Sequence, residues 1–310
     1  MKKIIFVLTL ISLFFLSSCD RKKRLEIVPV TSKVAYIANQ SNNTISVCPI
    51  LTDGSFDVCT VIADAAFNVP LGITLNSSGT FAYVANLSGN SVASCPVNTD
   101  YSFGTCTSEN ITGNHVDVIL SADDTYAYTT YFGSDFVTLC NVNNNGSLNN
   151  CIDSGAGAFF DGAQGMAINS AGTFAYVVGN SNDTISFCAI NSDGTFSSCA
   201  DSGNTGVSFS SPEMVTINPE GTFAYVSNFN NTILLCPINT DGSFGACISA
   251  GGSFSGPKGM RFNREGNRIY ISNSGNNSIS SCELNTDSTL ANCTSLTDAS
   301  FNGPWGIFIH

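Results

Sequence analysis

The chain has 310 residues, 43% of them hydrophobic and only 11% charged, so it can bury a large core but has few charges for ion pairs. From Val34 to Pro257 there is no Lys or Arg, whereas seventeen Asp or Glu fall in that stretch. Such a surface repels phosphate backbones and argues against nucleic acid as a partner. We therefore expect packing, strand ladders and covalent cross-links to supply the stability.

Residues 1–18 are predicted to be a targeting signal. Lys2 and Lys3 precede the apolar run 4–16, which is too short for an ordinary membrane-spanning helix. The run ends in Leu-Ser-Ser-Cys, which resembles the bacterial lipoprotein signal, in which the residue equivalent to Cys19 is lipidated and becomes the mature N-terminus. An ordinary secretory signal with a chance cysteine is the alternative.

Residues 19–30 are then predicted to be a lipidated basic tether. This places the protein in a bacterial cell envelope, attached to a membrane through its lipid and facing the periplasm or the cell exterior.

Residues 31–310 are predicted to repeat one unit six times. The aligned tyrosines lie 45 to 49 residues apart: Tyr36, Tyr83, Tyr128, Tyr176, Tyr225 and Tyr270. Each unit breaks at turn signals into four strands, which in the second unit are predicted over 71–76, 81–86, 91–97 and 102–107. A period near 45 residues without a helical stretch is typical of propeller blades. The predicted fold is an all-β, six-bladed propeller.

Twelve further cysteines form six pairs, each with ten intervening residues: Cys48–Cys59, Cys95–Cys106, Cys140–Cys151, Cys188–Cys199, Cys236–Cys247 and Cys282–Cys293. An export signal with regularly spaced cysteines indicates disulfides, one per blade. Zinc is the alternative, but the chain has two histidines and no closely spaced cysteine pairs, so no metal site is predicted.

The midpoint of each cysteine pair falls on a turn dipeptide, such as Asp53-Gly54 or Asp241-Gly242. Asp-Gly favours a type I′ turn, with positive φ at both residues. A symmetrical turn would set the two cysteines opposite each other, with Cα atoms about 4.5–5.5 Å apart.

Ring closure is predicted from the two ends of the repeat. The chain enters the first unit at its second strand, 34–39, and ends on an unpaired first strand, 304–310. We expect the C-terminal strand to complete the first blade and leave no open edge. Residues 25–28 are the alternative donor.

The repeat resembles a known family. "GTFAYVAN", with P-x-G before it and N-x-D-G after it, is similar to the YVTN/lactonase-type β-propeller repeat over roughly 31–310. The resemblance implies a propeller, commonly of seven blades, in a family that includes sugar-lactone hydrolases and many envelope proteins. No catalytic motif matches closely enough to transfer active-site residues.

A variable position in the P-x-G motif indicates a candidate site at the channel mouth. Its six residues are Leu71, Val116, Gln164, Glu213, Lys258 and Trp305, and His115 and Asp117 flank Val116 where most units have Pro and Gly. The ligand-binding residues predicted here are Gln164, Glu213, Lys258, Trp305, His115 and Asp117. The alternative is a solvated rim in which one Lys–Glu pair balances charge.

Loops between the second and third strands reach the same face and are rich in Asn, Ser and Gly. They suit ordinary turn chemistry, or alternatively a hydrogen-bonding surface for a glycan or peptide.

The predicted function is a monomeric binding or scaffold module for a protein or glycan partner, without a cofactor. The alternative is a lactonase-like hydrolase acting at the channel mouth, with Glu213, His115 and Asp117 as its catalytic candidates.

Overall fold

The structure is a computed structural model that describes residues 33–133, 135–155 and 160–310. The predicted signal 1–18, the tether 19–30 with Cys19, and the alternative closing strand 25–28 lie outside these residues. The described residues form strands and turns and contain no helix.

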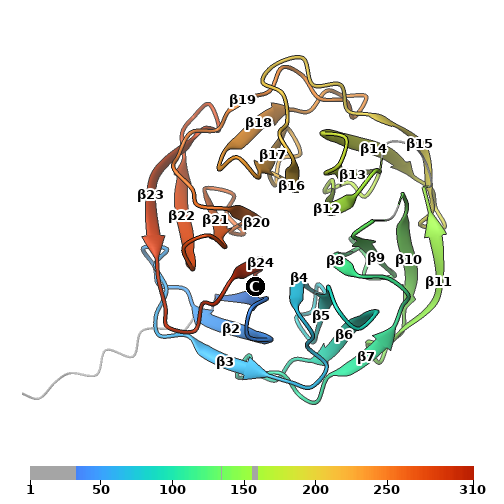
Figure 1. Ribbon diagram of the computed structural model, residues 1–310, viewed down its shortest axis with the longest axis vertical. Helices are drawn as coiled ribbons and strands as arrows, with labels where there is room; N and C mark the ends of the chain where they lie inside the picture. Colours follow the sequence, from blue (N-terminus) through green and yellow to red (C-terminus); the bar gives the residue numbers. More distant parts are fainter. Residues whose placement is uncertain (1–32, 134, 156–159) are drawn as a thin grey trace, which may run out of the picture. The chain divides into compact units, whose positions relative to one another are not determined.

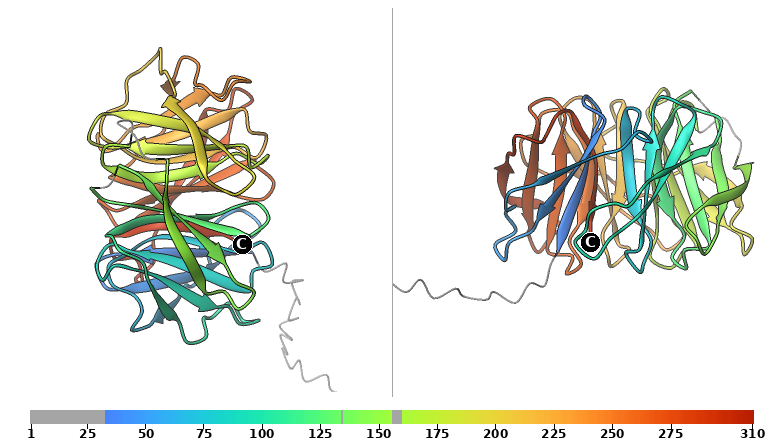
Figure 2. Two further views of the ribbon diagram at one scale, coloured as in Figure 1. Left: turned by 90° about the vertical axis from the view of Figure 1, so that its right-hand side faces the viewer. Right: turned by 90° about the horizontal axis from the view of Figure 1, so that it is seen from below.

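Six four-stranded antiparallel sheets stand around a central channel, as the repeat predicts (Figures 1 and 2). Blade 1 consists of β24 (Pro304–Ile309), β1 (Val34–Asn39), β2 (Thr44–Pro49) and β3 (Thr60–Ala63). Blade 2 consists of β4 (Pro70–Leu75), β5 (Phe81–Asn86), β6 (Ser91–Pro96) and β7 (Thr107–Asn110). Blade 3 consists of β8 (His115–Leu120), β9 (Tyr126–Tyr131), β10 (Val137–Val142) and β11 (Leu148–Ser154).

The remaining blades follow in chain order, each from the channel outward. Blade 4 consists of β12 (Ala163–Ile168), β13 (Phe174–Gly179), β14 (Thr184–Ile190) and β15 (Phe196–Asp201). Blade 5 consists of β16 (Pro212–Ile217), β17 (Phe223–Asn228), β18 (Ile233–Pro237) and β19 (Ile248–Ser249). Blade 6 consists of β20 (Pro257–Phe262), β21 (Arg268–Asn273), β22 (Ser278–Leu284) and β23 (Leu290–Leu296).

The C-terminal strand closes the ring, and this prediction is confirmed. β24 pairs antiparallel with β1, and His310 and Val34 exchange backbone hydrogen bonds of 2.9 and 3.4 Å. The first and last strands of the propeller thus pair within one blade, which removes the open edge that an unclosed ring would expose.

Apolar packing lies between blades rather than in one central core. Six clusters of buried side chains each join neighbouring sheets. The two inner strands of every blade are buried on both faces, so they read as near-continuous apolar runs in the sequence.

The second strand of each blade carries a buried tyrosine, and in five of the six blades its hydroxyl bonds to the next blade. Tyr176 of β13 donates its hydroxyl proton to the carbonyl of Gly242 at 2.9 Å, in the outer hairpin of blade 5, and stacks on Phe244 with ring centroids 5.2 Å apart. Burial raises the pKa of Tyr176 to about 12, so the hydroxyl stays protonated at neutral pH.

Five of the six tyrosines make this bond, which we call the tyrosine clasp. The other four donor–acceptor pairs are Tyr36 to Tyr101, Tyr128 to Gly194, Tyr225 to Ser288 and Tyr270 to Gly54. The last pair joins blade 6 to blade 1.

Tyr83 is the exception. The carbonyl that it would use, that of Gly146, accepts a 2.7 Å hydrogen bond from Ser94 instead, and the buried Tyr83 hydroxyl has no partner. Leu148 stands where Phe244 stands in blade 5, so no ring stacks on Tyr83. The seam between blades 2 and 3 therefore lacks both parts of the clasp.

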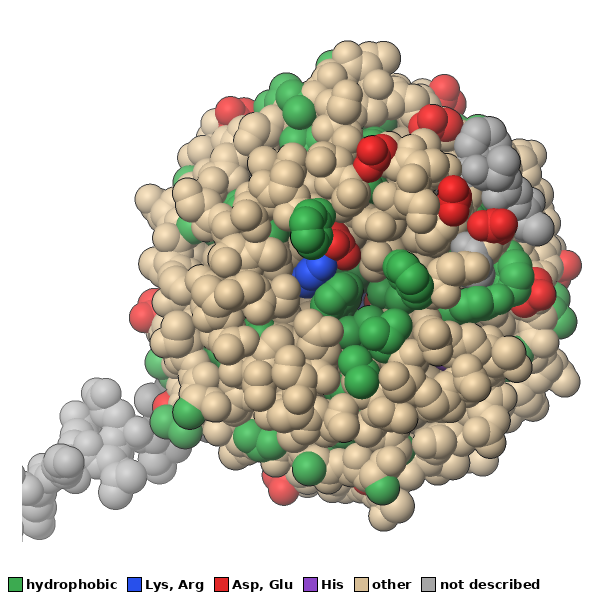
Figure 3. Space-filling model, viewed as in Figure 1, with side chains coloured by type: hydrophobic (Ala, Val, Ile, Leu, Met, Phe, Trp, Pro, Cys, Tyr) green, Lys and Arg blue, Asp and Glu red, His purple; other side chains and the backbone are tan. Residues whose placement is uncertain are grey.

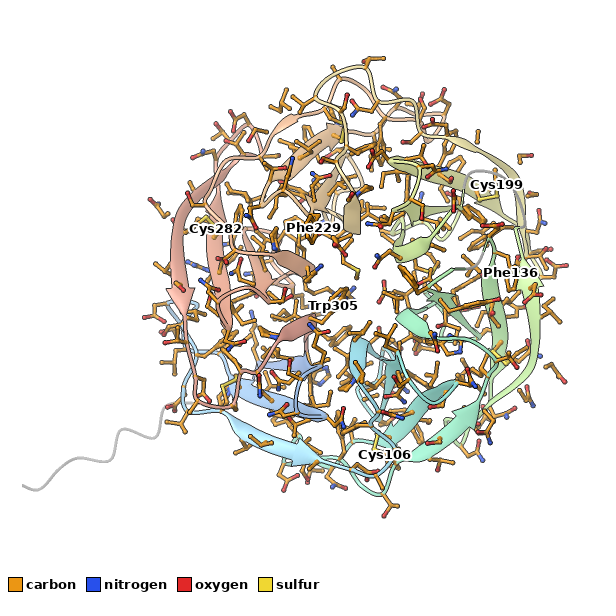
Figure 4. All side chains as sticks on the ribbon, viewed as in Figure 1. Cys106, Phe136, Cys199, Phe229, Cys282 and Trp305 are labelled. Carbon is orange, nitrogen blue, oxygen red and sulfur yellow. A yellow bond between two sulfur atoms is a disulfide. The ribbon has the colours of Figure 1, made fainter. Side chains whose placement is uncertain are left out.

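All six predicted disulfides are present, one per blade, toward the outer strands (Figure 4). Their Cα atoms are 4.0–4.2 Å apart, slightly closer than predicted. The pairing is thus confirmed, with the cysteines directly opposite each other.

The predicted type I′ turn is wrong. In blade 5 the Gly242 amide bonds the Asn239 carbonyl and the Asn239 amide bonds the Ser243 carbonyl, and of Asp241 and Gly242 only the glycine has positive φ, at 90°. This is a three-residue loop, a type I turn followed by a left-handed residue. A one-residue register shift between the turn and the cysteines then restores their alignment.

The start of the outermost strand was also predicted wrongly in the second unit, because β7 begins at Thr107 rather than at 102. Pro96 ends the neighbouring strand and has no amide proton to donate, so the ladder is interrupted beside it. Blade 4 has Ala189 at the equivalent place, and its outer strand starts at Phe196, directly after the turn.

We predict that Tyr176→Phe lowers the free energy of unfolding by about 1 kcal/mol, because it deletes a hydrogen bond and leaves the Gly242 carbonyl unpaired. Tyr83→Phe should be neutral or stabilising, because its hydroxyl is already unpartnered. Denaturant unfolding of the two variants beside the wild type measures both. Equal losses in the two variants would contradict the clasp.

Candidate functional site

The channel mouth lies at the face where the innermost strands begin and where the loops after the second strands turn back. In blade 2 this face is marked by the pairing of Pro70 with Asn86. A basic and an acidic side chain lie side by side near the centre of the face, among hydrophobic side chains (Figure 3). The acidic side chain is Glu213 of blade 5 and the basic one is Lys258 of blade 6, and Trp305 of blade 1 lies beside them.

Lys258 and Glu213 form a buried ion pair at this mouth. The Lys258 Nζ lies 2.7 Å from the Glu213 Oε1, and the two side chains are only 10% and 5% exposed. The other two ion pairs among the described residues each include a side chain at least 46% exposed. Removing such charges from water is costly, so this pair must be held in place by its surroundings.

Aromatic rings surround the ammonium group. Lys258 Nζ lies 4.2 Å from the Trp305 ring centroid and 5.8 Å from that of Phe229. Figure 4 shows Trp305 and Phe229 near the centre of the propeller. Phe229 is 69% exposed although it is aromatic, so it presents an apolar surface to any ligand above the ion pair.

Two buried polar atoms at the mouth have no hydrogen-bond partner. They are Glu213 Oε2 and Trp305 Nε1, an acceptor and a donor. An unpaired buried polar atom costs about 1–3 kcal/mol, so this part of the fold is not optimised for stability alone.

Neighbouring blades fix the backbone of the mouth residues. Ser227 of blade 5 donates to the Lys258 carbonyl at 3.0 Å, and Ser272 of blade 6 donates to the Trp305 carbonyl. The inner strands also approach very closely, since a Cβ on Gly259 would lie 2.6 Å from the Trp305 carbonyl oxygen. The motif glycine is therefore a packing requirement that positions the residue before it.

Of the six predicted binding residues, the structure brings Glu213, Lys258 and Trp305 into one cluster. Gln164 is 7% exposed, and its backbone carbonyl accepts a hydrogen bond from the Thr130 hydroxyl of blade 3. The remaining ring members, Leu71 and Val116, are each 1% exposed.

Asp117 lies inside the fold, where it is 5% exposed. Its carboxylate accepts the amide protons of Met166 at 3.0 Å and Val118 at 2.9 Å. Burial raises its pKa to about 6, although these amides and the charge of Arg261 oppose the shift. The carboxylate is thus a buried group that titrates near neutrality.

His115 is fully buried, and both of its ring nitrogens are occupied. Nε2 lies 2.9 Å from the Ile111 carbonyl and Nδ1 lies 2.9 Å from the Thr129 hydroxyl. Burial lowers the pKa of His115, which favours the neutral ring with Nε2 donating and Nδ1 accepting. In this geometry His115 has no nitrogen free for a ligand.

The Asn-rich loops use their side chains to support the backbone. Asn86 is buried and accepts the amide proton of Asn68, and Asn43 of blade 1 accepts that of Val69 at 2.7 Å, before blade 2. Equivalent inter-blade bonds are made by Asn90, Asp183, Asn231 and Asn277. These asparagine and aspartate side chains therefore bond to the backbone, and most of the bonds link one blade to the next.

Sequence reasoning missed Phe229 and Arg261. Phe229 is an aromatic residue in a loop otherwise made of asparagine, which is an unusual place for it. Arg261 lies three residues after Lys258 in β20, where the basic residues reappear after a long stretch without any. Both signals were visible in the sequence.

Two negative findings apply to the residues that the structure describes. No helix in them is long and apolar enough to cross a membrane. Within the same residues, no three side chains of the kinds that ligate metals gather in one place.

We predict that the stability of the wild type relative to Asp117→Asn falls as the pH rises from 4 to 7. A raised pKa means that the folded state favours the protonated acid, so this contribution is present below about pH 4 and is lost through about pH 6. The loss should be about 3 kcal/mol at most, because one pKa unit is worth about 1.4 kcal/mol. Thermal or denaturant unfolding at several pH values measures it.

Asp241→Asn is the control for this measurement. The hydrogen bond from the Ser243 side chain lowers the pKa of exposed Asp241, so its effect should have the opposite sign. A wild type to Asp117→Asn difference that does not change with pH would contradict the assignment.

Comparison with solved structures shows the same fold at low sequence identity. The periplasmic gluconolactonase of Pseudomonas aeruginosa is 16% identical, with a TM-score of 0.65 over 91% of this chain and 86% of that one. A chain of the nidogen/laminin complex is 13% identical, with a TM-score of 0.70 over 89% and 98%. An auxiliary nutrient binding protein of Bacteroides thetaiotaomicron is 9% identical, with a TM-score of 0.59 over 86% and 80%.

No curated protein sequence matches the chain. The family model described as "Lactonase, 7-bladed beta-propeller" matches residues 32–300, nearly the whole propeller. The described residues of this chain form six blades rather than the seven of that description. It belongs to the lactonase β-propeller family.

Proposed function

We propose that this chain hydrolyses a lactone at the channel mouth. Membership of the lactonase family supports the reaction class. The observation that carries the proposal is the buried Lys258–Glu213 pair, which places a carboxylate and an ammonium side by side against the aromatic ring of Trp305.

Lactone hydrolysis adds water to the ring carbonyl and needs two groups. A general base takes a proton from the water, and a positive charge stabilises the oxyanion that forms on the carbonyl. The ring C–O bond then breaks, and the base passes the proton to the departing ring oxygen, which becomes a hydroxyl group. The carboxylic acid that forms ionises to the carboxylate. In our proposal Glu213 is the base and the Lys258 ammonium faces the oxyanion. Trp305 and Phe229 hold the apolar face of the ring by stacking.

The side chain of Lys258 must shift for this reaction. Glu213 Oε2 is closed off from solvent, while Oε1 is occupied by Lys258. We infer that a ligand resting on Trp305 draws the ammonium toward its own carbonyl oxygen and opens Glu213 to a water molecule.

A binding or scaffold role is the second candidate. The observation that favours it is the pair of exposed aromatic side chains in the loops of the mouth face, Phe229 at 69% and Phe132 at 56%. Exposed aromatic side chains of this kind commonly anchor protein partners. In this second candidate function the mouth face binds a protein or a glycan.

The six disulfides indicate an oxidising compartment outside the cytoplasm. Within it, we propose attachment to a membrane through a lipid on Cys19.

The hydrolase is tested with glucono-δ-lactone in a pH-stat, after subtraction of spontaneous hydrolysis. Glu213→Gln should lower kcat by about 100-fold or more, because it removes the general base. Glu265→Gln is the matched control, since it breaks the exposed pair with Lys33 and should leave kcat unchanged. Equal effects of the two variants would contradict the assignment.

The same variants separate the two candidate functions. No turnover by the wild type across γ- and δ-lactones would refute the hydrolase. Capture of a partner from envelope extract that persists in Glu213→Gln and is lost in Phe229→Ser would then support the binding module.

A further inference from the structure

Two cations of β20 stack on two aromatic rings of β24, one pair above the other. Lys258 Nζ lies 4.2 Å from the Trp305 centroid, and Arg261 Cζ lies 4.6 Å from the Phe308 centroid. Each residue of the lower pair follows its upper counterpart by three positions, or about 10 Å of strand. We call these pairs the upper tier and the lower tier.

A strand irregularity explains why the two tiers face the same way. Residues three apart in a regular strand point to opposite faces. In β20 the register against β21 shifts by one between Pro257 and Met260, and this shift returns Arg261 to the side that Lys258 occupies.

The lower tier lacks the carboxylate that completes the upper one. Glu213 of β16 supplies that carboxylate above, and the residue three positions later in β16 is Thr216. None of the guanidinium donors of Arg261 has an acceptor among the described residues. A guanidinium with five donors thus stacks on Phe308 but has no hydrogen-bond acceptor among the described residues, in a protein of net charge −12.

Asp117 does not fill the gap. It is the one carboxylate whose charge acts on Arg261, but both of its oxygens accept backbone amide protons and no ion pair joins the two residues. The guanidinium therefore keeps its forked donor edge for a planar oxyanion.

We propose that Arg261 is a carboxylate-binding site in the channel below the mouth, and that its ligand is a small hydroxy acid. This choice of ligand rests on the proposed function, since hydrolysis of a neutral lactone yields a hydroxyl group and a carboxylate. The carboxylate forms beside Lys258 when the lactone opens, and in our proposal it then moves to Arg261. There it takes the place in the lower tier that Glu213 takes in the upper tier.

The test is calorimetric titration with gluconate, with neutral glucitol as the matched polyol. The wild type should bind gluconate and not glucitol. Arg261→Gln should raise the Kd for gluconate by about tenfold or more, because a charge-assisted pair is lost. Arg268→Gln is the control for a guanidinium that already has a partner, Glu283, and should leave the Kd unchanged.

A second variant fills the site from within. Thr216 follows Glu213 by three positions, as Arg261 follows Lys258, so we expect a carboxylate in Thr216→Glu to reach Arg261. This variant should abolish gluconate binding while the arginine is intact, whereas Thr216→Gln, of the same size, should retain binding. Melting curves establish that each variant is folded, and if Thr216→Glu does not fold, Arg261→Gln decides.

The inference would be overturned by any of three results. These are no gluconate binding by the wild type, equal binding of glucitol, and undiminished gluconate binding by Arg261→Gln. The readout does not depend on turnover. Gluconate binding that requires Arg261 in a chain without lactonase activity would refute the proposed function and leave this site standing.

Discussion

Neighbouring blades are held in register by a hydrogen bond that supplements their apolar packing, made by a buried tyrosine hydroxyl to the carbonyl of a left-handed turn residue in the next blade. The acceptor is a glycine in three of the five clasps and Tyr101 or Ser288 in the other two. This bond crosses every seam except that of Tyr83. In the last seam Tyr270 reaches Gly54, so the same contact that links successive blades also joins the two ends of the repeat.

The disulfide and the clasp act on the same hairpin. In blade 4, for example, the Cys188–Cys199 disulfide closes the hairpin whose turn residue Gly194 accepts the hydrogen bond of Tyr128. Cys188 is fully buried. A hairpin held in this way keeps its acceptor in place with few surface ion pairs, which fits a propeller that has no Lys or Arg from Val34 to Pro257. The channel-mouth face is then left free to differ between blades, and it carries the unpaired Glu213 and Trp305 atoms.

Much of the fold could be predicted from the sequence because it follows from repetition. Six tyrosines and six cysteine pairs fix the number of blades, and an unpaired final strand fixes the closure. The turn type could not be read, because ten intervening residues fit a symmetrical two-residue turn as well as a three-residue turn with a register shift. The late start of β7 follows from Pro96, which has no amide proton to continue the ladder.

The candidate site was predicted in part. Comparing equivalent positions identified Glu213, Lys258 and Trp305, which the structure brings together. It also selected His115, whose ring nitrogens are both bonded within blade 3, because a sequence does not show which polar groups satisfy each other. Arg261 lies outside the variable position of the P-x-G motif, so comparing that position does not select it, although the return of basic residues in β20 is visible in the sequence. The sequence does not show the register shift between Pro257 and Met260, which puts Arg261 on the same side of β20 as Lys258.

A crystal structure of the wild-type chain with gluconate tests the account most directly. We predict the polyol chain against Trp305, within hydrogen-bond distance of Glu213 and Lys258, with the Lys258–Glu213 distance longer than the present 2.7 Å and the carboxylate on Arg261. Ligand bound elsewhere, with this pair intact and nothing over Trp305, would contradict the assignment of the channel mouth as the functional site.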